Sequence, residues 1–242
     1  MNQIWIIAKR ELRSFFDSLI AYILIVLFLG FSGLFTWLIG NSVFYVNQAS
    51  MQVFFGVSFW SLFLFIPALT MRSIAEENRS GTIELLLTKP VTDWQLVTGK
   101  FLSVFLLIAI SLALTLPYYL TLWKLGPVDH GAVWTGYLGL LLMSAVYASI
   151  GIFASSISQN QIVAFLLSLL IGIFFHMIFG ALAATSTGFT GKVLSYLSMQ
   201  THFDSVSRGV IDSKDIVYFL SLVFLGLAGA EIAVAKRNIV EK

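Results

Sequence analysis

Six apolar segments, each long enough to cross a bilayer as a helix, constrain this chain more than any other feature of its sequence. A membrane-spanning helix needs about 20 predominantly apolar residues. The chain is 58% hydrophobic and only 11% charged, whereas soluble domains carry about 25% charged residues. Because backbone groups in hydrocarbon must satisfy their own hydrogen bonds, we predict one all-α polytopic membrane domain over residues 1–242. The expected spans are residues 19–40, 53–71, 101–123, 132–154, 162–183 and 215–234.

Residues 1–18, which precede the first expected span, have an amphipathic pattern. On a helical wheel, one stripe is mostly apolar and holds Trp5, Ala8, Leu12, Phe15 and Phe16. A second arc is mostly basic and holds Lys9, Arg10, Arg13 and Asp17. Such a helix lies in the membrane interface with its basic side toward the headgroups. A helix that caps the bundle from the cytosol is the alternative.

The distribution of basic residues orients the expected spans. An even number of spans places both termini on one side, and the side richer in Lys and Arg is normally cytoplasmic. If the termini are cytoplasmic, ten of the fourteen Lys and Arg residues are cytoplasmic too, at positions 9, 10, 13, 72, 79, 89, 100, 236, 237 and 242. We therefore predict cytoplasmic termini, a cytoplasmic segment 72–100 and an outer segment 184–214.

The segment 72–100 has more local pattern than a simple connector needs. Ser80 is placed to cap a short helix whose apolar face carries Leu86, and Pro90 ends this helix. Thr92, with Gln95 three residues later, predicts a capping box and a second helix. We interpret the segment as a docking element, with a plain helical connector as the alternative. At its end, Lys100 is expected to extend its ammonium group toward the interface.

The sequence offers little for catalysis. It has no Walker A pattern, so any ATP-driven work would need a partner, and it has no HExxH, GxSxG or GxGD pattern. His176, in the fifth expected span, has no carboxylate or second His nearby in sequence, and we expect it to be satisfied within the bundle. Without any Cys the chain has no disulfide or thiolate metal site. We expect no catalytic site, metal or bound cofactor, and an intramembrane enzyme is the less favoured alternative.

With these residues in view, the chain resembles the permease subunit of an ABC-2-type transporter along its whole length. The most specific part is AEENRSGTIELLLTKPVTDWQLVTGK, residues 75–100. The resemblance implies a cytoplasmic coupling helix between spans two and three, which docks in a cleft of a nucleotide-binding subunit. The implied docking residues are Glu76, Glu77, Arg79, Gly81, Thr82, Glu84, Leu85, Leu86, Thr88 and Pro90. Among them we expect positions 84–86 in the cleft and positions 76, 77 and 79 at its polar rim.

The same resemblance implies an N-terminal elbow helix, carrying Trp5, Lys9, Arg10 and Arg13, and a bacterial inner-membrane location. The implied partners are an ABC ATPase subunit, which would use ATP and Mg²⁺, a second permease chain, and the lipid bilayer; no nucleic acid is expected. Small residues allow helices to approach closely in lipid. We therefore expect the pairs Gly151 with Ser155 and Gly172 with Gly180 to favour a permease dimer.

Within the outer segment, residues 196–212 resemble the permeases grouped with gliding-motility GldF and, more distantly, the NosY group, although Met199 stands where Pro is usual. The resemblance implies export or envelope-directed work with a possible link to gliding; a non-transporting mechanical or assembly role is the alternative. The apolar residues of this stretch predict short helices packed at the outer mouth of the bundle, and an ordinary loop or a catalytic pair of His202 with Asp204 are the alternatives. The candidate residues are Tyr196, His202, Phe203, Arg208 and Asp212.

Overall fold

The computed structural model describes residues 3–40, 42–46, 48–81 and 91–240, and in these ranges it contains helices and connecting segments but no strand. The helices are α1 (Gln3–Asp17), α2 (Ile20–Trp37), α3 (Val43–Val46), α4 (Gln52–Thr70), α5 (Ala75–Ser80), α7 (Asp93–Ala113), α8 (Leu116–Leu125), α9 (His130–Ser156), α10 (Gln161–Ile173), a π-helical turn η1 (Phe174–Ile178), α11 (Phe179–Thr185), α12 (Gly188–Leu197), α13 (Met199–Ser207) and α14 (Ser213–Val240).

Six helical segments in the described ranges are long and apolar enough to cross a membrane. This confirms the predicted all-α class with six candidate spans. The segments are Ile20–Trp37, Gln52–Ser80, Asp93–Leu125, His130–Ser156, Gln161–Thr185 and Ser213–Lys236.

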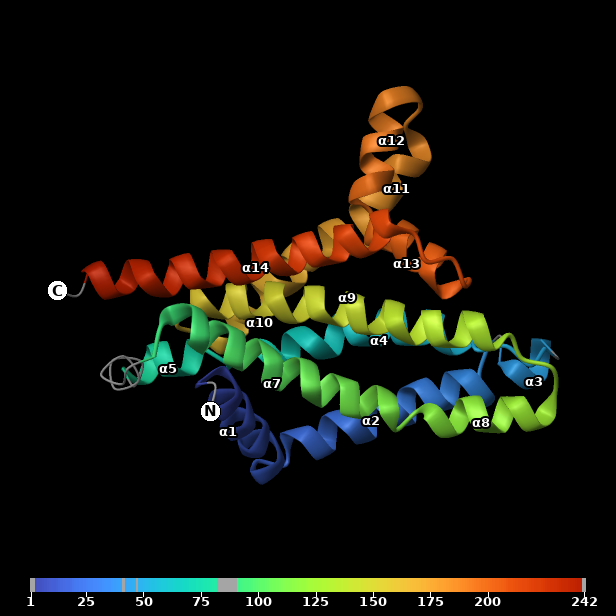
Figure 1. Cartoon of the computed structure of the whole chain (residues 1–242), viewed down its shortest axis with the longest axis horizontal. Helices are drawn as coiled ribbons and strands as arrows, with labels where there is room; N and C mark the ends of the chain where they lie inside the picture. Colours follow the sequence, from blue (N-terminus) through green and yellow to red (C-terminus); the bar gives the residue numbers. More distant parts are fainter. Residues whose placement is uncertain (1–2, 41, 47, 82–90, 241–242) are drawn as a thin grey trace.

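Helix α9 lies in the middle of the bundle and contacts α4, α7, α10, α13 and α14 (Figure 1). Its side chains at Leu140, Met143 and Tyr147 are essentially inaccessible to solvent. The start of α1, the helix α5 and the end of α14 all lie at one end of the bundle, which we call the α5 end. The short helix α3 lies at the opposite end, which we call the α3 end.

The small residues of α9 and α10 pack within this chain. A Cβ atom at Gly151 would overlap the side chain of Thr70 on α4, and one at Gly172 would lie 2.9 Å from the Phe63 ring, also on α4. A Cβ atom at Gly180 would lie 3.0 Å from the hydroxyl of Ser198, at the start of α13. These glycines therefore pack against α4 and the start of α13 of the same chain, and the dimer stays a prediction.

The third candidate span is interrupted just before a proline. Helix α7 ends at Ala113 and α8 begins at Leu116, with Pro117 in its first turn. Proline lacks an N–H and is tolerated in a first turn but not in a helix interior. Pro117 therefore accounts for the start of a new helix at this point.

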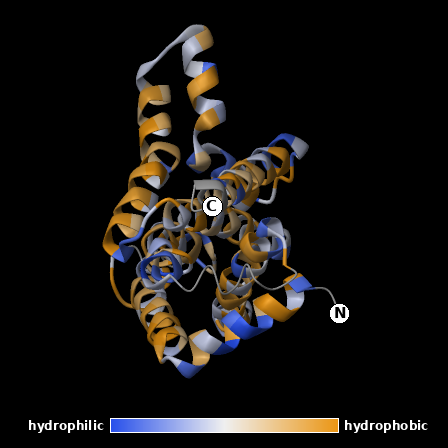
Figure 2. Ribbon diagram, turned by 90° about the vertical axis from the view of Figure 1, so that its left-hand side faces the viewer, coloured by the Kyte–Doolittle hydropathy of each residue, from blue (hydrophilic) through white to orange (hydrophobic). Residues whose placement is uncertain are grey.

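The predicted fifth span, 162–183, does not form one straight helix. It consists of α10, the π-helical turn and α11, and α11 pairs with α12 in a hairpin that stands away from the bundle (Figures 1 and 2). Phe189 at its tip is 80% exposed. By contrast, α13 buries Met199, Phe203 and Val206 against the bundle. Packed short helices are thus found at α13, whereas α12 is mostly exposed.

Candidate functional site

The start of α5 is fixed to the end of α9 by one hydroxyl group. Ser155 Oγ accepts hydrogen bonds from the backbone N–H groups of Ile74 (3.0 Å) and Ala75 (2.9 Å), and it donates to the carbonyl of Met71 (3.1 Å). The first N–H groups of a helix have no partner within the helix. Ser155 therefore serves as an N-cap supplied by another helix, and it holds α5 on α9.

A second contact strengthens this attachment. Asn78 on α5 donates from Nδ2 to the carbonyl groups of Ser156 (3.3 Å) and Ser158 (3.1 Å), which lie at and just after the end of α9. Helix α5 is thus held by its first residue and by its middle. Both attachments join α5 to the end of α9.

Lys100, near the start of α7, ties α5 to a further helix. Its Nζ donates to the carbonyl of Ser73 (2.7 Å) and to Glu77 Oε1 (2.7 Å), and its side chain is only 2% exposed. The expectation that this ammonium reaches toward the interface is wrong, because two acceptors from the α5 region meet it inside the protein. A buried charge needs partners of this kind to be tolerated.

Helix α1 also reaches this lysine. Glu11 Oε1 lies 3.7 Å from Lys100 Nζ and 2.6 Å from Arg10 Nη2. The approach depends on Gly99, since a Cβ there would lie 2.7 Å from a methyl group of Ile7 on α1. The adjacent Gly99 and Lys100 thus have linked roles: the glycine lets α1 come close, and the lysine pairs with its carboxylate. We call Glu11, Ser73, Glu77 and Lys100 the Lys100 network.

The predicted docking residues divide into three groups. Glu76, Arg79 and Gly81 are exposed at the α5 end, and Gly81 ends α5 with φ +69°, a conformation that favours glycine. Glu77 is held by Lys100 and is 19% exposed, so it belongs to the network rather than to an open rim. The remaining predicted positions lie outside the described residues: Thr82, Glu84, Leu85, Leu86, Thr88 and Pro90.

The second helix of the segment begins as predicted. Thr92 Oγ1 accepts from the N–H of Gln95 (3.3 Å), and Gln95 Oε1 accepts from the N–H of Thr92 (3.1 Å). This reciprocal pair confirms the capping box. Helix α7 continues from this cap into the third candidate span.

On α1, the exposed basic residues are Lys9, Arg10 and Arg13. Trp5 is 48% exposed, so it does not share the packed face, which is formed by Ile7, Ala8 and Phe15. The helical wheel placed Trp5 on the apolar stripe with Ala8 and Phe15, but the packing of α1 on α7 is centred nearer to Ile7.

The outer candidate residues do not form a catalytic pair of His202 with Asp204. His202 Nδ1 lies 2.6 Å from Asp215 Oδ1, and Nε2 lies 3.0 Å from the carbonyl oxygen of Tyr196. Burial raises the pKa of the Asp204 carboxyl, and Arg208 one turn later opposes this shift. His202 and Phe203 are buried and hold α13 in place, whereas Tyr196 and Arg208 are exposed. The carboxylate of Asp212 pairs with Lys214 at 3.0 Å, which lowers the pKa of Asp212.

His176 is less satisfied than expected. It lies in the π-helical turn, between the rings of Phe59 (4.1 Å) and Phe63 (4.4 Å), with Nδ1 2.5 Å from the hydroxyl of Tyr147. Its Nε2 is buried and has no hydrogen-bond partner among the described residues. Among all the residues that the structure describes, no group of three or more His, Cys, Asp or Glu side chains is arranged to hold a metal ion.

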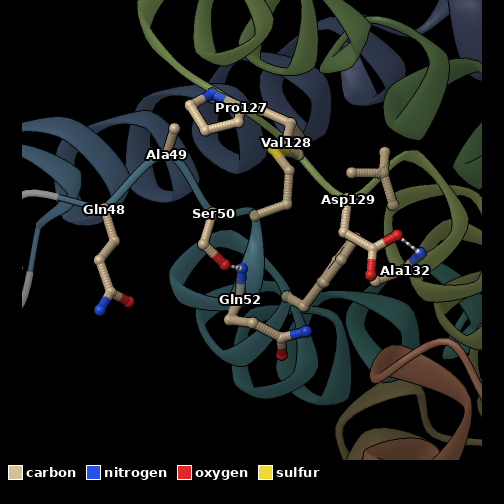
Figure 3. A pocket seen from close by; sticks show the side chains of 11 residues that line it. Gln48, Ala49, Ser50, Gln52, Pro127, Val128, Asp129 and Ala132 are labelled. Carbon is tan, nitrogen blue, oxygen red and sulfur yellow. Dashed lines mark hydrogen bonds between the residues drawn. The ribbon is translucent and has the colours of Figure 1, made fainter.

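A pocket of about 470 Å³ lies at the α3 end, between residues 48–55 and 127–133 (Figure 3). Its polar side chains serve the local backbone: Ser50 Oγ accepts from the N–H of Gln52 (3.2 Å), and Asp129 Oδ1 accepts from the N–H of Ala132 (3.1 Å). Gln52 Nε2 donates to the carbonyl of Ser207, 2.8 Å away. These bonds fix the two loops and α13 at this end of the bundle.

We compared the sequence with models of known protein families. A family model described as "ABC-2 family transporter protein" matches residues 38–233. The chain belongs to the ABC-2 transporter family. With six candidate spans, this ABC-2 protein is a multi-pass membrane protein and a permease component of an ABC-type transporter. The match includes the segment 72–100 and excludes α1. No curated protein matches the sequence.

Proposed function

We propose that this ABC-2 permease passes the motion of a separate nucleotide-binding subunit to its spans through the segment 72–100. The observation that carries the proposal is the double attachment of α5, to α9 by Ser155 and to α7 by Lys100. Exposed residues of the same helix, Glu76 and Arg79, remain available to a partner. A docking element needs such an open tip and such a firm base.

In this proposal, the partner binds and hydrolyses ATP with Mg²⁺, and this chain contributes no catalytic residue. Closure of the ATPase subunits displaces α5. Since α5 is attached to both α7 and α9, the displacement reaches two spans together rather than bending a loop. Leu85 and Leu86 would anchor the segment in the ATPase cleft, beside Glu84.

The remaining parts of the proposal concern the assembly. The excess of Lys and Arg on the α5 side supports cytoplasmic termini. The resemblance to ABC-2 permeases leads us to place the chain in a bacterial inner membrane. A second permease chain would complete the transport pathway. The complex would carry out export or envelope-directed work. The most specific version of this proposal is a GldF-like role linked to gliding motility.

Co-purification of the ATPase subunit with permease variants tests the docking. An apolar anchor in a desolvated pocket often contributes about 2 kcal/mol or more, whereas an exposed rim charge contributes about 0–1 kcal/mol. Leu86→Ala, Leu86→Asp and Glu84→Ala should therefore weaken association or uncouple hydrolysis. Arg79→Ala should mainly change the salt dependence, and Gly81→Pro should uncouple by distorting the end of α5. Lys124→Ala, at an exposed position near the α3 end, is the control. Full association and coupling of Leu86→Asp would show that the segment is a plain connector.

The alternative is that the complex does mechanical or assembly work and moves nothing across the membrane. Flux of candidate substrates into sealed vesicles, measured together with ATP consumption, distinguishes the two. Substrate movement in proportion to hydrolysis supports export. Hydrolysis that depends on an envelope partner and is accompanied by no flux favours the mechanical role.

A further inference from the structure

A shallow, open groove of about 680 Å³ lies along the exposed side of α1. It is lined by three basic, one acidic, two hydroxyl and two apolar side chains: Trp5, Ile6, Lys9, Arg10, Arg13, Ser14, Asp17 and Ser18. Arg10 pairs with Glu11, but Lys9 and Arg13 have no carboxylate of the described residues within 4.0 Å. Two exposed cations without an ion-pair partner among the described residues therefore lie one turn apart, with Asp17 as the single carboxylate of the lining.

The position of α1 directs this groove toward the membrane surface. The opposite face of α1, with Ile7 and Phe15, packs against the bundle, and the helix runs steeply across the long axis of the spans (Figure 1). Asp17 is followed after two residues by α2, the first candidate span. Because a helix rises about 1.5 Å per residue, Lys9 and Arg13 lie roughly 12 Å and 6 Å along the helix axis from Asp17, the last residue of α1.

The lining also combines the two chemical characters of a phospholipid. Trp5 and Ile6 are 48% and 49% exposed beside the cations, and tryptophan favours the boundary between headgroups and acyl chains. Lysine and arginine bind phosphate oxygens by charge-assisted hydrogen bonds. An acidic protein surface would complement the cations but would not account for the exposure of the two large apolar side chains beside them.

We propose that this groove binds the headgroup of an anionic phospholipid from the leaflet that α1 faces, with the phosphate between Lys9 and Arg13 and the upper acyl chain against Trp5 and Ile6. The inference does not depend on ATPase docking. It assigns α1 a selectivity for lipid charge in addition to a position in the interface.

Native mass spectrometry of the purified full chain, with added phosphatidylglycerol or phosphatidylcholine of the same acyl composition, tests the proposal. The wild type should retain phosphatidylglycerol preferentially. Each basic side chain near an anionic surface contributes about 1 kcal/mol, so Lys9→Gln/Arg13→Gln should weaken phosphatidylglycerol binding by roughly tenfold or more. Arg72→Gln/Lys236→Gln removes the same charge outside the groove and should bind like the wild type. Lys9→Arg/Arg13→Lys, which keeps both charges, should also retain the lipid.

Two results would overturn the proposal. One is equal binding of the two lipids by the wild type; the other is an equal loss in both Gln double variants, which would show that only net charge matters. Binding of phosphatidylglycerol to the wild type should also fall as salt is raised, because exposed charges are screened. This second measurement needs no variant, and salt-independent binding would contradict the site even if a variant failed to fold.

Discussion

The Lys100 network makes a quantitative prediction about stability. Lys100→Met removes an ammonium group that donates to Ser73 O and Glu77 Oε1, both at 2.7 Å. Hydrogen bonds to charged groups contribute about 1.5–3 kcal/mol each, and removing one partner of a fully buried ion pair costs about 3–5 kcal/mol. Glu77 is 19% exposed, so water partly compensates it. We therefore expect Lys100→Met to lower the free energy of unfolding by about 3 kcal/mol.

The effect of Glu77→Gln on stability should have opposite signs in two backgrounds, which makes this prediction sharper. In the wild-type background, Glu77→Gln weakens the pair and should destabilise the protein. In the Lys100→Met background, the same change removes an uncompensated carboxylate and should stabilise it. The assay is unfolding of the purified protein in mixed micelles for the wild type, both single variants and the double variant. Lys124→Met, at an exposed position, should change stability by no more than about 0.5 kcal/mol.

Additive effects of the two substitutions would refute the reasoning. So would wild-type stability of Lys100→Met, because the network would then contribute no net stabilisation. Hydrogen exchange of residues 74–78 provides a separate readout, since release of α5 should increase exchange there even if global stability changes little.

Three further predictions concern other parts of the chain. Thr92→Ala should lower helix stability by about 1 kcal/mol and speed hydrogen exchange in the first turn of α7, and unchanged exchange would argue against the capping box. Gly151→Leu should prevent normal packing of α9 on α4 and reduce the yield of monodisperse protein, whereas Gly30→Ala, where a Cβ meets nothing within 4 Å, should be tolerated; equal yields would contradict the packing. His202→Phe should lower the thermal stability by leaving Asp215 buried without its partner, and the double change with Asp215→Asn should recover part of the loss; no recovery would count against the pair.

How much of this was visible in the sequence depends on the range of each interaction. The capping box at Thr92 is a local pattern over four residues, and its chemistry can be read directly. The break before Pro117 is equally local. The six apolar runs predict the fold class because their composition alone excludes a soluble domain.

The Lys100 network was missed for the opposite reason. Its acceptors come from residues 23 and 27 positions earlier, and a third helix adds Glu11. A lysine at the start of an apolar run is ordinarily expected to extend toward water. The partners of Lys100 meet because α1 crosses α7 at Gly99 and because α5 is held on α9. Neither contact follows from a local sequence pattern.

The small residues show a related difficulty. The sequence indicates that Gly151 and Gly172 allow a close approach, and this is correct. It does not indicate which helix approaches, and the structure shows α4 of the same chain. Likewise, the apolar residues of 184–214 suit either packing on the bundle or exposure on a hairpin, and only the structure shows that α13 takes the first position and α12 the second.

The central claim, that the exposed tip of α5 meets an ATPase subunit, is tested most directly by site-specific photocross-linking. A photoreactive amino acid at Glu76 or Arg79 is compared with one at Tyr45, which is 80% exposed near the α3 end, in cells that also produce a candidate nucleotide-binding subunit. We predict adducts between permease and ATPase from positions 76 and 79 and none from position 45. Adducts from position 45, or their absence from positions 76 and 79 while the two subunits still co-purify, would contradict the claim.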